Sequence, residues 1–136
     1  MKTVVDISYV SELVMVNIGI WNKKINDLSK MLITVDTGAS VTTISTDILY
    51  KLGYEVSAGE KQRIITASNI EYVNSVCIDK IKIGDITINN VDVYSYSFPE
   101  SSFSLGVLGL NILKKFDVYF RFSKNELEPI NTILEF

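Results

Sequence analysis

The residues best suited to carry chemistry in this chain form one short run after an apolar segment, Asp36-Thr37-Gly38-Ala39-Ser40. An aspartate on a tight Thr-Gly turn holds its carboxylate off the end of a strand and toward a cleft. The chain contains no histidine, so the usual proton shuttle is missing and carboxylates are the candidate acid and base groups. Nucleophile systems that pair serine or cysteine with histidine are excluded for the same reason.

Each residue of this run has a physical reason to be there. Gly38 tolerates backbone angles that other residues resist, and its N–H can approach the Asp36 carboxylate closely. Thr37 is stiff at χ1, and its hydroxyl can bond locally or across an interface. Because Asp36 follows Ile33 and Val35 on an apolar strand, we expect its carboxyl to be partly desolvated.

Two later segments bear on the same chemistry. The apolar residues Val107 and Leu108 precede a glycine, and a hairpin tip is expected between the two motifs at Ala67-Ser68-Asn69-Ile70. The spacing to that tip leaves room for an intervening helix and two turns. Taken alone, segment 107–109 predicts only a buried strand before a helix, and the Asp-Thr-Gly run is also compatible with an ordinary Asx-type turn.

Short strands dominate the elements that must position these residues. β-Branched residues are frequent, and most segments alternate with period two, which predicts strands. We expect strands at 3–9, 13–18, 31–35, 41–44, 61–66, 72–83, 87–96, 117–122 and from 127 onward. A polar loop is expected at 19–27, helical turns after residue 45 or 46 and within 110–116, and a hairpin turn at Gly84-Asp85. This pattern predicts an all-β, β-barrel-like domain with one or two short helices.

Length and composition narrow the class of protein. The 136 residues are enough to bury a real core, and we expect a single domain over 1–136. The net charge is −3 and no basic stripe is present, so no nucleic-acid partner is expected. The single cysteine, Cys77, is expected to be a small apolar residue inside a strand. No apolar run is long enough for a membrane span, and we expect a cytoplasmic protein without membrane contact.

Together, the Asp-Thr-Gly run, the hairpin tip and the apolar-apolar-glycine segment resemble the retropepsin-like aspartic proteases, from about Leu13 to Leu127. Segment 110–116 looks more like cellular and bacterial single-domain members than like retroviral ones. The resemblance implies that Asp36 is the catalytic aspartate, in a catalytic loop with Thr37 and Gly38. It also implies a flap over the substrate at 67–70 and a buttress of the catalytic loop at 107–109.

The same resemblance implies a polypeptide substrate that lies extended beside Asp36, with hydrogen bonds from Gly38 and from backbone groups of the flap. The residues expected to bind it are Ala39, Ala67, Ser68, Asn69, Ile70, Val107 and Leu108. Apolar subsites are expected at Ile33, Ile70 and Val107. No metal or cofactor is implied.

Peptide hydrolysis by carboxylates needs two carboxyl groups that act together. One ionised carboxylate takes a proton from water, and one protonated carboxyl polarises the scissile carbonyl, so two groups in contact share one proton. The chain holds a single Asp-Thr-Gly run and no Asp-Ser-Gly, so the partner is expected to be Asp36 of a second copy across the twofold axis of a homodimer. The resemblance suggests that Thr37 of the two copies brace each other there. The apolar run 132–136 is expected to pair with the terminus of the other copy.

Departures from the retroviral pattern leave other readings open. Retroviral members usually have aspartate as the fifth residue of the catalytic motif and arginine after the later glycine. This chain has Ser40 and Leu110 there, which favours a different interface. The flap tip lacks glycines, so Asn69 is expected to supply a positive φ, and segment 67–70 is equally compatible with a plain β-turn. Two alternatives therefore stand: an inactive module that binds a peptide or partner strand by backbone pairing, and a β-barrel adaptor in which Asp36 only closes a turn.

Overall fold

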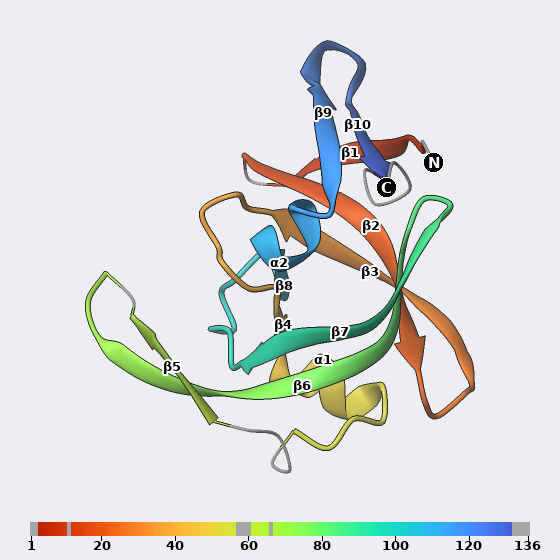
Figure 1. The fold of residues 1–136 in the computed structure, drawn as a ribbon. Helices are drawn as coiled ribbons and strands as arrows, with labels where there is room; N and C mark the ends of the chain where they lie inside the picture. The colour runs from red at the N-terminus through yellow and green to blue at the C-terminus, as the bar shows by residue number, and fades with distance from the viewer. Residues whose placement is uncertain (1–2, 11, 57–60, 66, 132–136) are drawn as a thin grey trace.

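The computed structural model describes residues 3–10, 12–56, 61–65 and 67–131 (Figure 1). Its strands are β1 (Val5–Val10), β2 (Leu13–Asn22), β3 (Asp27–Val35), β4 (Thr43–Ser45), β5 (Lys61–Ile65), β6 (Ile70–Ile83), β7 (Ile86–Tyr96), β8 (Gly106–Leu108), β9 (Phe116–Arg121) and β10 (Glu126–Asn131). The helical elements are α1 (Thr46–Lys51), α2 (Leu110–Leu113) and a 3₁₀ turn, η1 (Phe122–Lys124). The prediction of an all-β chain with short helices is confirmed.

The strands form one ten-stranded sheet in the order β5-β6-β7-β4-β8-β3-β2-β1-β10-β9. An additional pairing of β2 with β6 closes six of these strands into a barrel-like ring. Most neighbours are antiparallel, but β3 lies parallel to β8 and β4 lies parallel to β7. Because parallel neighbours need a long crossover connection, residues distant in the sequence meet where β3 ends (Figure 1).

The core is a cluster of buried, mainly aliphatic side chains contributed by the strands of the ring, by both α-helices and by β1, β9 and β10. The largest fully buried hydrophobic side chains are Met15, Ile18, Ile20, Ile33, Ile44, Leu49, Ile78, Ile81, Leu108, Ile112 and Leu127. Burial along β7 alternates on either side of Asn89 and Asn90, which are both exposed, and this is the period-two pattern of a strand with one face toward a core. Burying each such aliphatic side chain stabilises the fold by about 1.5–3 kcal/mol.

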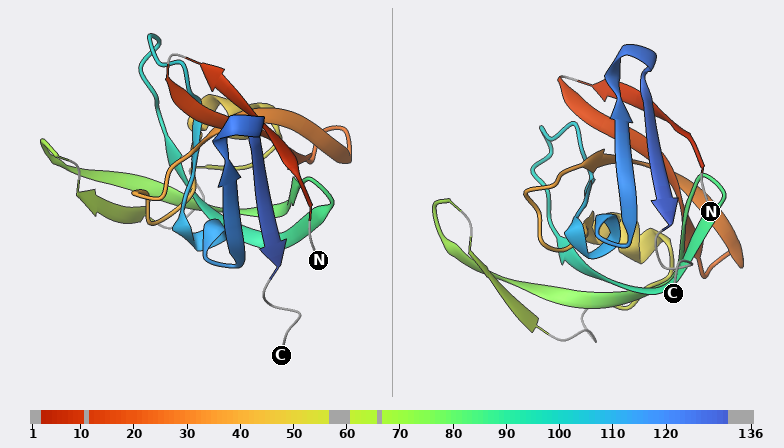
Figure 2. Two further views of the ribbon diagram at one scale, coloured as in Figure 1. Left: turned by 90° about the horizontal axis from the view of Figure 1, so that it is seen from above. Right: turned by 45° about the horizontal axis from the view of Figure 1, so that its top comes forward.

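Two hairpins project from this body, as all three views show (Figures 1 and 2). The β5–β6 hairpin pairs from Lys61↔Asn74 to Ile65↔Ile70 and curves outward on one side. The β9–β10 hairpin lies beside β1, away from the β5–β6 hairpin (Figure 1). An ion pair of 2.6 Å joins Arg121 Nη2 on β9 to Glu128 Oε2 on β10. The body of the molecule is thus a packed ring. The β9–β10 hairpin contributes Phe116 and Leu127 to the core, whereas no described residue of β5 belongs to the core cluster.

The predicted loop at 19–27 is wrong for all but the turn at 23–26. Strand β2 continues through Gly19 to Asn22, and β3 begins at Asp27. Gly19 belongs in this strand because β6 crosses it there: a Cβ on Gly19 would lie 3.3 Å from the Cβ of Lys82. A glycine that reads locally as a turn signal is therefore explained by the close approach of a distant strand.

The predictions for the turn at 84–85, for Cys77 and for the run 132–136 have different outcomes. The hairpin turn at Gly84-Asp85 is confirmed, with Ile83 paired to Ile86 and a φ of +58° at Gly84. Cys77 lies inside β6 but is exposed, so it is not a core residue. The run 132–136, expected at the terminus of a second copy, lies outside the described residues. Within the described part of the chain, no helix has the length and apolar character needed to cross a membrane.

The inner end of β6 is anchored by a buried tyrosine. The hydroxyl of Tyr54 donates to the backbone carbonyl of Trp21 at 2.9 Å and accepts the backbone N–H of Asp79 at 3.3 Å. Only 3% of Tyr54 is exposed, and this burial raises the pKa of its phenol above the ordinary value of 10.0. The outer half of β6, beyond this anchor, carries the projecting hairpin.

Candidate active site

Asp36 follows the last residue of β3, where that strand lies beside β8. Its backbone N–H donates to the carbonyl of Leu108 at 3.1 Å. Its carboxylate Oδ1 accepts the N–H of Gly38 at 2.8 Å, and its carbonyl accepts the N–H of Ala39 at 3.2 Å. These bonds close an Asx-type turn and fix the direction in which the carboxylate points.

The Asp36 side chain is exposed in the single chain, so the expected partial desolvation is wrong. The apolar residues of β3 face the core, whereas the turn lifts the carboxylate off the end of the strand. Among the described glycines, positive φ occurs at Gly53 and Gly84 and not at Gly38. A Cβ on Gly38 would lie 3.1 Å from Asp36 Oδ1, so glycine is needed here for close approach rather than for an unusual backbone.

Helix α2 holds the turn from behind. The N–H of Leu110 donates to the carbonyl of Ala39 at 2.8 Å, and the N–H of Asn111 donates to that of Ser40 at 3.1 Å. Gly109 lies so close that an added Cβ would come within 2.7 Å of the Val41 backbone. Retroviral members carry a charge pair at positions 40 and 110; here backbone hydrogen bonds join each of these positions to a neighbour of the other, Leu110 to Ala39 and Ser40 to Asn111.

The side chain of Asn111 adds a second connection. Its Oδ1 accepts both the backbone N–H and the hydroxyl of Thr42, each at 2.8 Å, and its Nδ2 donates to the carbonyl of Asp92 at 2.8 Å. The Thr42 hydroxyl oxygen in turn accepts the N–H of Gly109 at 3.0 Å. Because Thr42 is fully buried, this network satisfies polar groups that would otherwise be costly to bury.

A cavity of about 300 Å³ opens beside the Asp36 carboxylate. Its wall on the β3–β8 side includes Asp36, Ala39 and Val107, and its opposite wall includes Ile64 and Glu71 of the β5–β6 hairpin. The complete lining is Asp36, Ala39, Thr43, Ile64, Glu71, Tyr96, Phe98 and Val107. The Asp36 carboxylate and the projecting hairpin thus face a common space.

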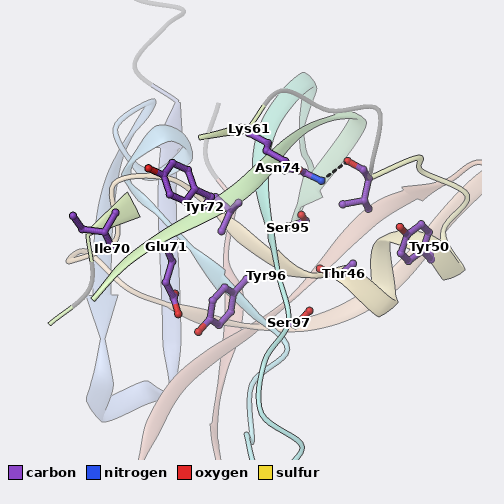
Figure 3. Close-up of a pocket in the computed structure, with 12 residues that line it drawn as sticks. Thr46, Tyr50, Lys61, Ile70, Glu71, Tyr72, Asn74, Ser95, Tyr96 and Ser97 are labelled. Carbon is purple, nitrogen blue, oxygen red and sulfur yellow. Dashed lines mark hydrogen bonds between the residues drawn. The ribbon is translucent and has the colours of Figure 1, made fainter. Parts of the chain in front are cut away.

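A second, larger cavity of about 640 Å³ adjoins the first, since Glu71 and Tyr96 line both. Figure 3 shows the Glu71 side chain on the opposite side of β6 from Ile70 and Tyr72, directed toward Tyr96. Alternation along a strand produces this arrangement, because neighbouring side chains point to opposite faces. Glu71 therefore points under the hairpin while its neighbours are largely exposed.

The residues expected to bind substrate fall in three places. Ala39 and Val107 line the Asp36 cavity, and Ile70 lines the larger one. The tip residues Ala67, Ser68 and Asn69 are exposed and line neither cavity. Leu108 and Ile33 are buried in the core, with 1% and 0% exposure, so no open subsite includes them.

The tip also differs in backbone from the expectation. Asn69 is not among the described residues with positive φ, so that prediction is wrong. Its Oδ1 instead accepts the N–H of Ile70 at 2.8 Å, which starts β6 with a side-chain bond. The tip forms without a glycine or a left-handed residue among those described.

Sequence reasoning missed five residues of the Asp36 cavity, namely Thr43, Ile64, Glu71, Tyr96 and Phe98. Glu71 had a usable signal: it alternates with the apolar residues Ile70 and Tyr72, so it must occupy the other face of the hairpin. The others come from separate elements, and only the parallel pairing of β4 with β7 brings Thr43 near Tyr96.

A third concavity, an apolar groove of about 260 Å³, lies on the α2–β9 side of the turn at 36–40. It is lined by Thr37, Leu110, Leu113, Lys114, Phe116, Val118 and Phe120. Thr37 is exposed and makes no hydrogen bond within the described part of the chain. An apolar groove that opens at the protein surface is typical of an interaction site.

No described set of three or more cysteine, aspartate or glutamate side chains is placed to hold a metal ion.

Comparisons with known proteins agree with this geometry. A family model described as aspartyl protease matches residues 21–112. A retropepsin-like aspartic protease from Rickettsia conorii has a similar structure, with a TM-score of 0.66 and 20% identity over 95% of this chain and 89% of that one. The retroviral protease-like domain of Ddi1 from Leishmania major gives a TM-score of 0.59 and 13% identity, over 88% of this chain and 93% of that domain. Curated proteins give no match. The predicted retropepsin-like fold is confirmed.

Proposed function

Because the chain belongs to the aspartyl protease family, we propose that it is a homodimeric aspartic endopeptidase in which Asp36 of each copy acts on one shared water. The observation that carries the proposal is the Asp36 carboxylate, fixed by the Gly38 N–H and exposed at a cavity. The ionised carboxylate takes a proton from the water, whose oxygen attacks the peptide carbonyl. The protonated carboxyl polarises that carbonyl, and a proton passed to the leaving nitrogen completes the cleavage.

A second copy is needed because one chain does not supply a carboxylate pair in contact. Glu71 is the other carboxylate that lines the Asp36 cavity. No hydrogen bond joins Glu71 to Asp36 in the described residues, and Glu71 Oε2 has no partner there. A shared proton requires the two groups to touch. The pair from two copies would titrate as a unit and give a bell-shaped activity profile with its maximum on the acid side of neutrality.

The apolar groove beside Thr37 supports an interface at this position. It adjoins the catalytic turn, so a second copy that covers it also brings a second Asp36 close. Contact there would bury the exposed Thr37 hydroxyl against its counterpart and exclude water from α2 and β9.

The substrate would lie extended between the catalytic turn and the β5–β6 hairpin. Ala39 and Val107 line the cavity, and we assign them, with Gly38, to substrate contact. The hairpin residues 67–70 would act as the flap over the bound chain. Leu108 is buried and acts through its carbonyl, which holds the Asp36 backbone; we assign it a positioning role.

One experiment tests the assignment: measurement of the mass in solution by light scattering, together with digestion of a synthetic peptide library. We expect a dimer at micromolar concentration and cleavage products from the wild type. The variant Asp36→Asn should remain dimeric and folded but release no products. Cleavage by this variant, or full activity of a monomer, would overturn the proposal.

A second candidate function is a module that binds an extended peptide without cleaving it. The observation that favours it is the position of β5 at the end of the sheet order, because an edge strand can accept a further strand by backbone pairing. Under this alternative, the wild type and Asp36→Asn would retain library peptides equally, and neither would produce fragments.

A further inference from the structure

We propose that the cavity between Asp36 and the β5–β6 hairpin is a subsite for a lysine or arginine side chain of the substrate, recognised by Glu71. This inference rests on the proposed peptidase function and names a preference of the same site. It assigns to Glu71 the selection of substrate rather than a step of the hydrolysis.

The first support is the state of the Glu71 carboxylate. Its Oε2 atom is shielded from solvent and has no hydrogen-bond partner in the described residues. A buried oxygen left without a donor is costly, and a carboxylate more so than a neutral group. Because Glu71 lines both adjoining cavities, a rotation of its side chain would bring this oxygen to a donor that arrives with a ligand.

The second support is the charge of the cavity. Asp36 and Glu71 are both part of its lining, and no lysine or arginine belongs to it. A substrate carboxylate placed there would face two like charges, whereas an ammonium or guanidinium group would be attracted by both. Charge alone therefore favours basic over acidic side chains.

The third support is the set of apolar and aromatic side chains in the cavity lining. Ile64, Phe98 and Val107 provide apolar walls, which suit the methylene stem of a long cationic side chain. Tyr96 and Phe98 lie edge to face with ring centroids 5.2 Å apart, and aromatic faces also attract cations. An apolar side chain would fill the walls but would leave the Glu71 oxygen without a partner.

In the proposed dimer, each copy contributes one such cavity, and the twofold axis relates the two. The two would lie on opposite sides of the bond that is cut. A basic residue is therefore expected near the cleaved bond on either side, and peptides with one on each side should be the best substrates.

The test compares wild type with Glu71→Gln, which keeps the shape and removes the charge. The matched control is Glu126→Gln, on β10 and away from the cavity. Library digestion by the wild type should give cuts enriched in lysine or arginine within two residues of the bond. For a cleaved peptide and its norleucine counterpart, Glu71→Gln should lower the kcat/KM ratio by about tenfold to a hundredfold. Glu126→Gln should leave the ratio unchanged.

A binding arm uses Asp36→Asn, with and without Glu71→Gln, and the same library selected on the immobilised protein. Basic peptides should be retained by Asp36→Asn and lost when Glu71→Gln is added, and Glu71→Lys should shift retention to acidic peptides. Cleavage that depends on Asp36 with no basic enrichment would overturn the subsite and leave the peptidase standing. Absence of cleavage with selective basic retention would overturn the peptidase and leave the subsite standing.

Discussion

The two walls of the Asp36 cavity are built in opposite ways. The turn at 36–40 is tied to α2 by backbone hydrogen bonds and by the Asn111 network, and Gly109 packs directly against it. The facing β5–β6 hairpin projects from the ring, and its large apolar residues Ile65, Ile70 and Tyr72 are 76%, 51% and 69% exposed. One wall is fixed by the core, and the other is held mainly by its own strand pairing.

This difference matches two requirements of the hydrolytic site that we propose. A catalytic carboxylate needs a constant direction, and buried hydrogen bonds with tight backbone packing provide it. A wall that must admit and release a polypeptide needs low local stability, which follows from few buried contacts and exposed strand pairing. Substitutions in the two walls should therefore differ in kind: the first kind changes folding and catalysis together, and the second changes substrate handling alone.

The largest expected effect comes from Asp36→Asn. It removes the charge while retaining an oxygen that can accept the Gly38 N–H, so the turn should persist. We expect kcat/KM to fall by at least about 10³-fold, within the range of general acid–base catalysis. The midpoint of thermal unfolding should stay close to that of the wild type. A coincident loss of the folded state would instead show that Asp36 acts only as a turn residue.

The next effect tests the packing behind the turn. In Gly109→Ala the new methyl group would overlap the backbones of Ala39, Val41 and Thr42. We expect the free energy of unfolding to fall by about 1–3 kcal/mol, as for overpacking of a core, and peptidase activity to fall with it. Both are read from denaturant titration and peptide cleavage.

The matched control is Gly19→Ala, in which the nearest atoms are side-chain atoms of Lys82 and Leu28 at 3.3 Å or more. It should cost less stability and leave cleavage unchanged. Equal effects of the two glycine variants would mean that the turn is no more tightly packed than the barrel.

A smaller effect is expected in the projecting hairpin. Ile70→Ala should change the free energy of unfolding by less than about 0.5 kcal/mol, because the side chain is half exposed. Cleavage should change mainly through KM, since Ile70 lines the outer cavity. In the same strand, Ile78→Ala removes a fully buried side chain and should cost about 2–5 kcal/mol. A hairpin variant as costly as the core variant would contradict the comparison.

The smallest effect concerns the anchor of β6. Because burial raises the pKa of Tyr54 above 10.0, the folded state keeps the phenol proton at pH values where the unfolded chain has lost it. The unfolded state then binds fewer protons, so stability should decline as pH rises above 10. Tyr54→Phe should flatten that decline, and Tyr72→Phe, at an exposed tyrosine, should not. Urea titration across this pH range measures both.

Sequence patterns predicted the fixed wall better than the free one. The Asp-Thr-Gly turn and the segment before Gly109 have local signatures, because a tight turn and a close backbone approach each demand particular residues. The hairpin tip has no such demand, and the expected positive φ at Asn69 is not found. Where geometry tolerates many residues, the sequence carries little information about it.

Contacts between strands distant in the sequence were the other feature that sequence patterns did not predict. Gly19 reads as a turn residue, yet it lies in β2 where β6 crosses. Glu71 and Cys77 are an even number of residues apart in β6, yet Glu71 lines the cavity and Cys77 is exposed. The hydrophobic pattern of one strand does not show which distant residues each of its side chains will face. The cavity lining therefore emerged only with the pairings of β4, β7 and β8.

The parallel pairing of β3 with β8 has a consequence for how the protein comes into being. Thr42 and Asn111, whose bond frames the reactive turn, are 69 positions apart, so a large loop must close before that frame exists. Such non-local pairings form slowly. During synthesis Asp36 leaves the ribosome well before α2 does, so the hydrogen-bonded frame of its turn is completed only after both segments have emerged.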